Sequence, residues 1–106
     1  MAKYLVEASY TAEGLKGLQK EGAAGRVQLA HKIAESLGGK CDGFYWAFGE
    51  QDVVAIFDLP NSVAIAALAF AVSSSGLIRT KTTPLLTAAE TDEALKKSVS
   101  FRPPGR

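Results

Sequence analysis

Apolar and polar residues alternate along four stretches of the chain and recur at helical spacing along two others. The alternation predicts four β-strands, over residues 3–10, 40–48, 51–59 and 77–86. Apolar positions at three- and four-residue steps predict a helix over residues 23–37, which Gly38-Gly39 ends. An Ala-rich segment after Pro60 predicts a second helix over residues 63–73. The order is β-α-β-β-α-β, which is the ferredoxin-like α+β plan of a four-stranded antiparallel sheet with both helices on one face.

Weaker signals lie outside these six elements. Thr11 is a predicted N-cap for a turn or two of helix that Gly14 and Gly17 weaken. Residues 88–99 predict an extra C-terminal helix, with acidic residues near its start and basic residues near its end. We expect residues 1–99 to form a single domain and residues 100–106 an extended tail.

The run from Phe44 to Pro60 predicts a hairpin. Two segments rich in aromatic and β-branched residues flank a turn that carries Gly49, two carboxylates and an amide. The near-continuous apolar run Val53–Phe57 marks the second strand of this hairpin as central in the sheet. Asp42-Gly43 predicts a bulge or a late start in the first strand.

Both faces of the predicted sheet carry apolar residues. Val53, Ala55 and Phe57 fall on one face of the central strand, and Val54 and Ile56 fall on the other. Helices on one side would leave a larger apolar patch exposed than a monomer usually tolerates. The second helix is also apolar around its whole circumference. We therefore expect a homodimer, or a higher homo-oligomer, with a partner sheet as cover and further contact over this helix.

Composition and charge exclude several classes of partner. The net charge is +1 with basic and acidic residues interspersed, so no single-sign field favours nucleic acid. The longest apolar run has ten residues, which is too short to span a membrane, and the N-terminus does not resemble a secretory signal. A single cysteine, Cys41, makes no internal disulfide, so a cytoplasmic location is the default expectation and the thiol is packed or on the surface.

Two carboxylates, Glu50 and Asp52, lie in the predicted turn. They either satisfy turn amides or contact a ligand. Two carboxylates alone are a weak metal signal, so we predict no metal site and no cofactor. The only histidine, His31, lies away from the apolar stripe of its helix and is expected to face solvent or a partner chain.

Arg26 falls almost in line with that apolar stripe. Its stem is expected to lie along the sheet while its guanidinium either snorkels or pairs with a carboxylate. The alternative is that it meets an anionic ligand at the mouth of a barrel.

Aromatic residues of the strands form a further set of candidates. They either belong to the core or line a cleft, between sheet and helices or between two sheets, that suits a small planar ligand. The principal candidates are Tyr10, Tyr45 and Trp46. Arg79 and Lys81 project to one face of the last strand, as solvated edge charges or as a charged pocket wall.

The hairpin also carries a family resemblance. Gly49-Glu50-Gln51-Asp52 followed by Val53-Val54-Ala55-Ile56 and a Pro60-led Ala-rich helix resembles the GYD domain family of bacterial proteins, over residues 3 to 90. Gln51 stands where the family has its tyrosine, so no role of that ring is transferred. The resemblance implies a dimeric α/β barrel, a superfamily that includes cofactor-free oxygenases, haem-degrading enzymes and stress proteins.

Three functions follow as expectations. The first is a small ligand-binding or stress-related accessory protein that uses the barrel interior without catalysis. The second is a cofactor-independent monooxygenase or isomerase acting on an aromatic or enol substrate. The third is a purely structural oligomer. No constellation of nucleophile, histidine and acid is predicted from spacing.

Overall fold

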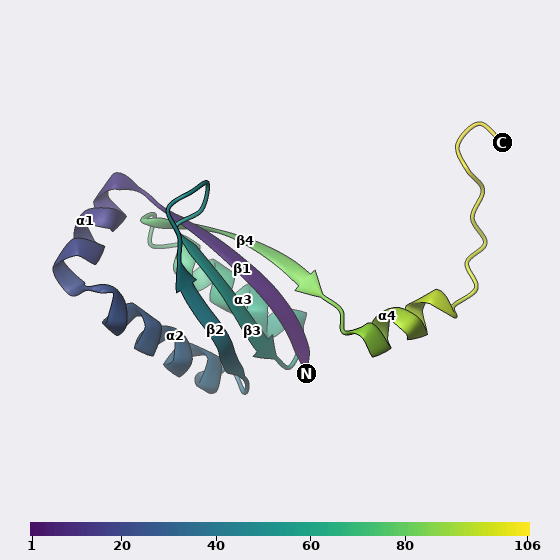
Figure 1. Ribbon diagram of the computed structural model, residues 1–106, viewed down its shortest axis with the longest axis horizontal. Helices are drawn as coiled ribbons and strands as arrows, with labels where there is room; N and C mark the ends of the chain where they lie inside the picture. The colour runs from purple at the N-terminus through teal and green to yellow at the C-terminus, as the bar shows by residue number, and fades with distance from the viewer.

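The computed structural model describes residues 1–106 and contains one four-stranded antiparallel sheet with strand order β2-β3-β1-β4 (Figure 1). The strands are β1 (Ala2–Tyr10), β2 (Lys40–Trp46), β3 (Val53–Leu59) and β4 (Ile78–Leu85). The helices are α1 (Ala12–Glu21), α2 (Ala23–Ser36), α3 (Ser62–Ser73) and α4 (Ala88–Leu95). The predicted ferredoxin-like α+β fold is confirmed, and β3 lies inside the sheet as expected.

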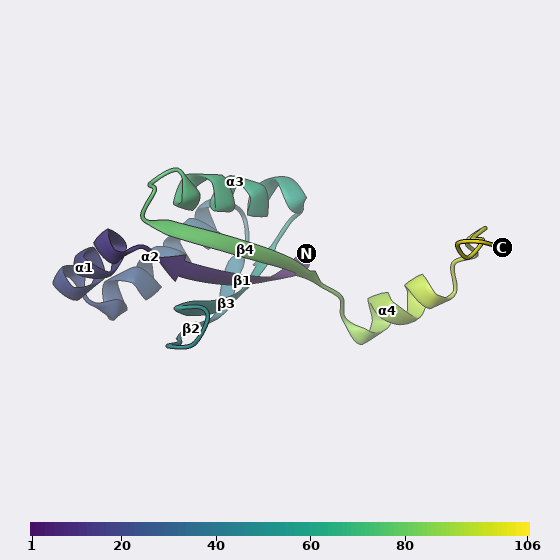
Figure 2. The ribbon, with the colours of Figure 1, turned by 90° about the horizontal axis from the view of Figure 1, so that it is seen from above.

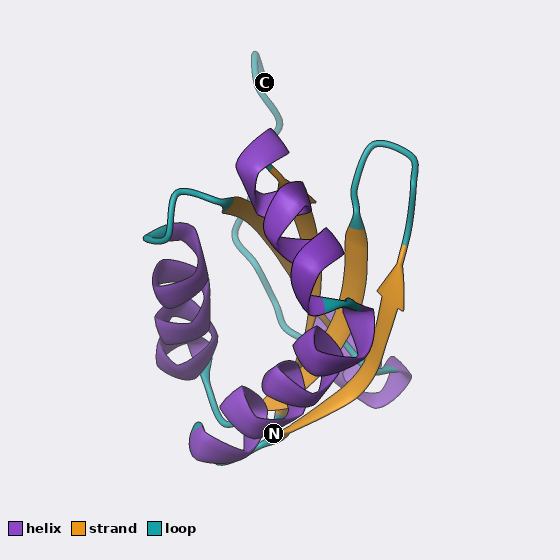
Figure 3. Cartoon of the chain, turned by 90° about the vertical axis from the view of Figure 1, so that its left-hand side faces the viewer, coloured by secondary structure: helices purple, strands orange, loops and turns teal.

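The core forms because the buried apolar residues of β1 and those of β3 point to the same face of the sheet. Antiparallel pairing sets Val6 opposite Ala55, so the even-numbered residues of β1 and the odd-numbered residues of β3 share one face. Helices α2 and α3 cover that face, and Figure 3 shows α3 and the α1–α2 pair gathered on one side of the strands. The buried residues at this interface include Tyr4, Val6, Val53, Ala55, Phe57, Ala34 and Leu68.

Several boundaries differ from the sequence prediction. Helix α1 has ten residues instead of one or two turns, and the Thr11 side chain caps it by accepting a hydrogen bond from the Gly14 amide. Gly14 does not weaken this helix but lets it pack, because an added Cβ there would overlap the Leu77 carbonyl oxygen. Strand β2 ends at Trp46 and β3 starts at Val53, which makes the hairpin loop longer than predicted.

A β-bulge interrupts β2 at the predicted place. Cys41 pairs with Phe57 and Gly43 pairs with Ile56, so Asp42 is the extra residue. Beyond the bulge, Phe44 and Trp46 share the helix-covered face and Tyr45 faces the other way. Cys41 is packed, not exposed, and burial raises the pKa of its thiol.

The second face of the sheet has no helix over it, and only part of it is apolar. Leu5, Val54 and Ile56 form the apolar part and are half-buried. Glu7 lies on the same face of β1, between Val54 of β3 and Lys81 of β4.

Charged residues also pair at one end of this face. The Lys3 ammonium lies 2.6 Å from an Asp42 carboxylate oxygen and 3.3 Å from one of Asp58. These hydrogen bonds raise the pKa of Lys3, and the bond from Lys3 lowers the pKa of Asp42. The expected apolar second face is therefore present at Leu5, Val54 and Ile56, and charged residues surround it.

The C-terminal segment leaves the domain at the end of β4. Helix α4 ends at Leu95, earlier than the expected Val99, and has no substantial contact with any other helix or strand. Figures 1 and 2 both show it projecting from the side of the molecule opposite α1 and α2, which extends the longest dimension to 56 Å. None of the helices combines the length and apolar content needed to cross a membrane.

The turn between α2 and β2 is a Schellman motif. Gly38 has a φ of 84°, the Gly39 amide donates to the Ala34 carbonyl at 2.9 Å, and the Gly38 amide donates to the Glu35 carbonyl at 3.0 Å. Gly39 then passes so close to β3 that an added Cβ would overlap the Asp58 carbonyl oxygen. Both glycines are therefore required for α2 to return its chain to the sheet.

We predict that Gly39→Ala lowers the free energy of unfolding by about 2–3 kcal/mol, because the new methyl group has no room beside the β3 backbone. Urea unfolding followed by the fluorescence of Trp46, the single tryptophan, measures this change. Gly17→Ala is the matched control. Gly17 has nothing within 4 Å of an added Cβ and lies inside α1, so the same change should stabilise by about 0.5–1 kcal/mol. Equal stability of Gly39→Ala and the wild type would contradict the packing described here.

Candidate functional site

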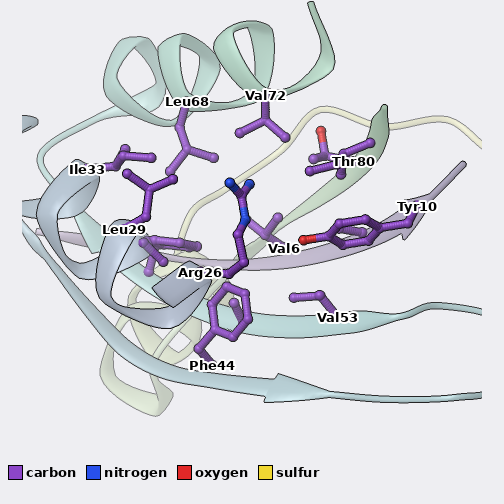
Figure 4. A pocket seen from close by; sticks show the side chains of 15 residues that line it. Val6, Tyr10, Arg26, Leu29, Ile33, Phe44, Val53, Leu68, Val72 and Thr80 are labelled. Carbon is purple, nitrogen blue, oxygen red and sulfur yellow. The ribbon is translucent and has the colours of Figure 1, made fainter. Parts of the chain in front are cut away.

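A cavity of about 70 Å³ lies between the sheet and helices α2 and α3. All four strands and both helices contribute to its wall, and 13 of the 15 lining residues are hydrophobic. The apolar side chains that Figure 4 labels around it are Val6, Leu29, Ile33, Phe44, Val53, Leu68 and Val72. The site is an apolar pocket inside one chain, between the sheet and its own helices.

Three side chains bring polar atoms to this wall, one of them a tyrosine that counts among its 13 hydrophobic residues. They are the Arg26 guanidinium from α2, the Tyr10 hydroxyl from the end of β1 and the Thr80 hydroxyl from β4. Figure 4 shows the Arg26 side chain extending into the middle of the cavity, with the Tyr10 hydroxyl directed toward it. A cation and a hydroxyl donor thus face one another in apolar surroundings.

The charge of Arg26 is only weakly compensated by the protein. Its one ion pair is with Glu21, with 3.8 Å between the nearest nitrogen and oxygen atoms. The Arg26 side chain is 27% exposed and that of Glu21 is 48% exposed. A long, solvated ion pair contributes little, so the guanidinium retains hydrogen-bonding capacity for another anionic group.

A second cavity, of about 160 Å³, adjoins the first on the side of α1. Its lining includes Gly14, Leu18 and Glu21, and it shares Tyr10 and Arg26 with the first cavity. The two shared polar side chains therefore lie where the spaces meet. A ligand held there can place one part against the sheet and another against α1.

Trp46 supports the wall of the site from outside the cavity. Its ring centroid lies 5.9 Å from that of Tyr10 and 5.5 Å from that of Phe44, which are contact distances for aromatic pairs. Its indole nitrogen is buried and has no hydrogen-bond partner. Trp46 therefore packs behind two lining residues and is close enough to report changes at Tyr10.

The hairpin loop positions Tyr10. The Asp52 carboxylate accepts a hydrogen bond from the Tyr10 amide at 2.8 Å, and the Asp52 amide donates to the Ala8 carbonyl at 2.8 Å. Gln51, at the position of the family tyrosine, accepts from the Ser9 hydroxyl at 2.7 Å. These bonds tie the loop to the end of β1. Glu50 is exposed and takes no part in them.

The seven candidates from the sequence are thus divided between separate places. Tyr10 and Arg26 meet in the cavity, Trp46 packs beside them, and Asp52 holds the backbone of Tyr10. Tyr45 and Arg79 lie on the opposite face of the sheet, where Tyr45 is 67% exposed, and Glu50 lies at the hairpin. No three His, Cys, Asp or Glu side chains gather closely enough to hold a metal ion.

Sequence reasoning missed Thr80 and the apolar lining. Arg26, Leu29 and Ile33 have the spacing of one helix face, as do Leu68 and Val72. That spacing describes a packed core equally well, because a cavity appears only once separate elements are brought together. Thr80 lies between Arg79 and Lys81 in the sequence, and nothing in that pattern indicated that it lines a cavity.

A small ferredoxin-like domain with an apolar cavity and one inward-facing arginine is the class of protein that this fold and site define. The family model for the GYD domain matches residues 4–95, and the chain belongs to this family. The match extends the expected resemblance through α4. No curated protein and no solved structure matches the chain.

We predict that Asp52→Ala lowers the free energy of unfolding by about 1–3 kcal/mol, because the part-buried Tyr10 amide loses its acceptor. Asp52→Asn retains an acceptor oxygen and should lose less than half as much. Thermal unfolding followed by circular dichroism gives both values. Glu50→Ala, two residues away and exposed, is the control and should be neutral; the role given to Asp52 is wrong if all three variants unfold alike.

Proposed function

We propose that the protein is a homodimeric small-molecule binder whose ligand is an amphipathic monocarboxylate. The ligand carboxylate lies at Arg26 and Tyr10, and its apolar part fills the cavity between the sheet and helices α2 and α3. The weakly paired guanidinium inside an otherwise apolar cavity carries this proposal. We further propose that binding of this ligand serves a stress-related accessory role, as the family resemblance implies.

A carboxylate fits the polar groups better than a neutral ligand does. The guanidinium presents a planar fork of donors that matches a carboxylate in two parallel hydrogen bonds. The Tyr10 hydroxyl supplies a further donor on the same side of the cavity. Charge-assisted bonds of this kind are strongest where apolar walls exclude water.

The cavity volume limits the apolar part of the ligand. An engineered protein cavity of about 150 Å³ holds benzene. The inner cavity, at about 70 Å³, therefore suits a short branched aliphatic group. Larger or more polar parts of the ligand fit the adjoining cavity beside α1.

Binding without chemistry is better supported than catalysis. Arg26, Tyr10 and Thr80 are hydrogen-bond donors that orient an anion. The carboxylate beside them, Glu21, lines the adjoining cavity, is 48% exposed and pairs with Arg26, so it is poorly placed to act as a base. The cavity also favours binding over a purely structural role. A monooxygenase or isomerase remains the alternative, and turnover of a bound carboxylate would establish it.

A homodimer would cover the second face of the sheet. The apolar centre formed by Leu5, Val54 and Ile56 has no cover within the chain. Charged residues border these three. Glu7 lies opposite Val54 on β1, Lys3, Asp42 and Asp58 lie at one end, and Arg79 and Lys81 lie along edge strand β4. An apolar centre inside a charged border is the usual anatomy of a protein interface.

We predict that 4-methylpentanoate changes the fluorescence of Trp46, while the uncharged 4-methylpentanamide binds more weakly. Arg26→Met should weaken carboxylate binding by roughly 10- to 100-fold, because hydrogen bonds to charged groups are worth about 1.5–3 kcal/mol. The same variant should bind the amide as the wild type does. Titration calorimetry gives the affinities.

Two further variants control this test. Glu21→Gln removes the competing carboxylate and should raise affinity by about two- to fivefold, as expected for an exposed pair. Arg79→Met deletes the same charge on the opposite face and should leave binding unchanged. Equal loss in Arg26→Met and Arg79→Met, or no preference for the carboxylate, would refute the site.

We predict that Ile56→Glu raises the dissociation constant of the dimer by at least about 30-fold, because a charge then lies at the centre of the interface. Native mass spectrometry of untagged protein measures the oligomeric state and any co-purified ligand. Gln28→Glu, on the exposed side of α2, is the control and should not alter assembly. A wild-type chain that is monomeric and ligand-free would overturn both parts of the proposal.

A further inference from the structure

The chain exposes two apolar surfaces that do not line the ligand cavity. The first is the C-terminal arm, residues 86–101, in which Leu86, Leu95, Val99 and Phe101 are 63–78% exposed. The second is the α3 stripe, formed by Val63, Ala67 and Phe70 on the outer side of α3. Both surfaces lack a partner within the chain.

The α3 stripe has the form of a helix-packing surface. Its three residues are four and three positions apart, which aligns them on one side of the helix. Val63 is 77% exposed and Phe70 is 73% exposed, with a small alanine between them that allows close approach. The helix Ser62–Ser73 contains no charged residue, so nothing on it repels or requires a charged partner.

The arm is preformed for docking. Thr87 and Glu90 form a complete capping box at the start of α4, with the Glu90 carboxylate accepting from the Thr87 amide at 2.9 Å. An eight-residue helix standing alone in water is marginal, even with good caps. The family match includes α4, which makes this helix part of the domain and not an appended tail. A helix of this kind needs a surface to pack on.

The arm does not pack on the α3 stripe of its own chain, because α4 makes no substantial contact with α3 or with any other helix or strand. The structure shows the arm extending away from the domain instead (Figures 1 and 2).

We propose that the C-terminal arm of one copy packs on the α3 stripe of a second copy of this chain. Both surfaces expose apolar side chains without a partner, and the structure holds them apart within one chain, so packing the arm of one copy on the stripe of another covers both. This contact is separate from the sheet-to-sheet contact of the proposed homodimer. It links copies through the outer side of α3. Each copy can place its own C-terminal arm on a second copy and bind the arm of another copy on its α3 stripe.

Disulfide trapping between differently labelled chains tests the contact. In a Cys41→Ser background, chains carrying Leu95→Cys are mixed with isotope-labelled chains carrying Phe70→Cys and oxidised mildly. Mixed-mass disulfide dimers should form at least about fivefold faster than with Lys32→Cys, an exposed position on α2, because disulfides require closely placed Cβ atoms. Equal rates with the two acceptor positions would overturn the proposal.

A chain carrying both Leu95→Cys and Phe70→Cys tests whether the arm packs on its own α3 or on that of a second copy. Oxidation should yield linked chains and not an internally closed monomer, which would place the arm on its own α3. Leu95→Asp in the full chain should reduce assembly beyond that seen for Lys97→Asp, the matched exposed control. If the sheet-to-sheet dimer forms but no disulfide links the arm of one chain to α3 of another, only this inference is refuted. Carboxylate binding, monitored through Trp46 fluorescence, tests the ligand site independently of either contact between chains.

Discussion

The pairing of β1 with both β3 and β4 is the constraint on which the rest of the molecule depends. It sets Val6 between Ala55 on one side and Thr82 on the other. The side chains of these residues on all three strands therefore point to the face that the helices cover. A shift of one residue would turn every core side chain to the opposite face. The cavity, the helix layer and the uncovered second face all follow from this one register.

The site combines features that usually exclude each other in a protein core. A guanidinium always carries a positive charge, yet Arg26 extends from α2 among leucine and valine side chains. Its solvated neighbour Glu21 lies at the end of α1, across the positive-φ residue Gly22. The chain therefore keeps a cation close to apolar walls without burying it completely, which avoids much of the desolvation cost. That compromise is consistent with the anion-binding role that we propose for Arg26.

Local signals in the sequence predicted the elements well, because strands, caps and glycine turns depend on neighbouring residues. The alternation of residues 53–57, the Gly38-Gly39 helix end and the bulge at Asp42-Gly43 are all present. The candidate site was harder to predict because its wall comes from six separate elements. Tyr10 and Tyr45 looked equivalent as strand aromatics, and only strand pairing places them on opposite faces of the sheet. Likewise, the charges near the two ends of residues 88–99 predicted α4, but the sequence contained no signal that this helix would stand clear of the domain.

The bulge at Asp42 determines which aromatic side chains face the cavity. The bulge absorbs one extra residue after Cys41, so Phe44 and Trp46 point toward the helices and Tyr45 points away. If Asp42 instead paired regularly with β3, alternation would direct Tyr45 toward the cavity and turn Phe44 and Trp46 outward. Loss of the bulge at constant chain length would thus exchange a phenyl wall for a phenol without any change of length. The lining of the cavity among related chains can therefore diverge through the presence or absence of a bulge in β2, a form of variation that a residue-by-residue comparison of pocket positions would not detect.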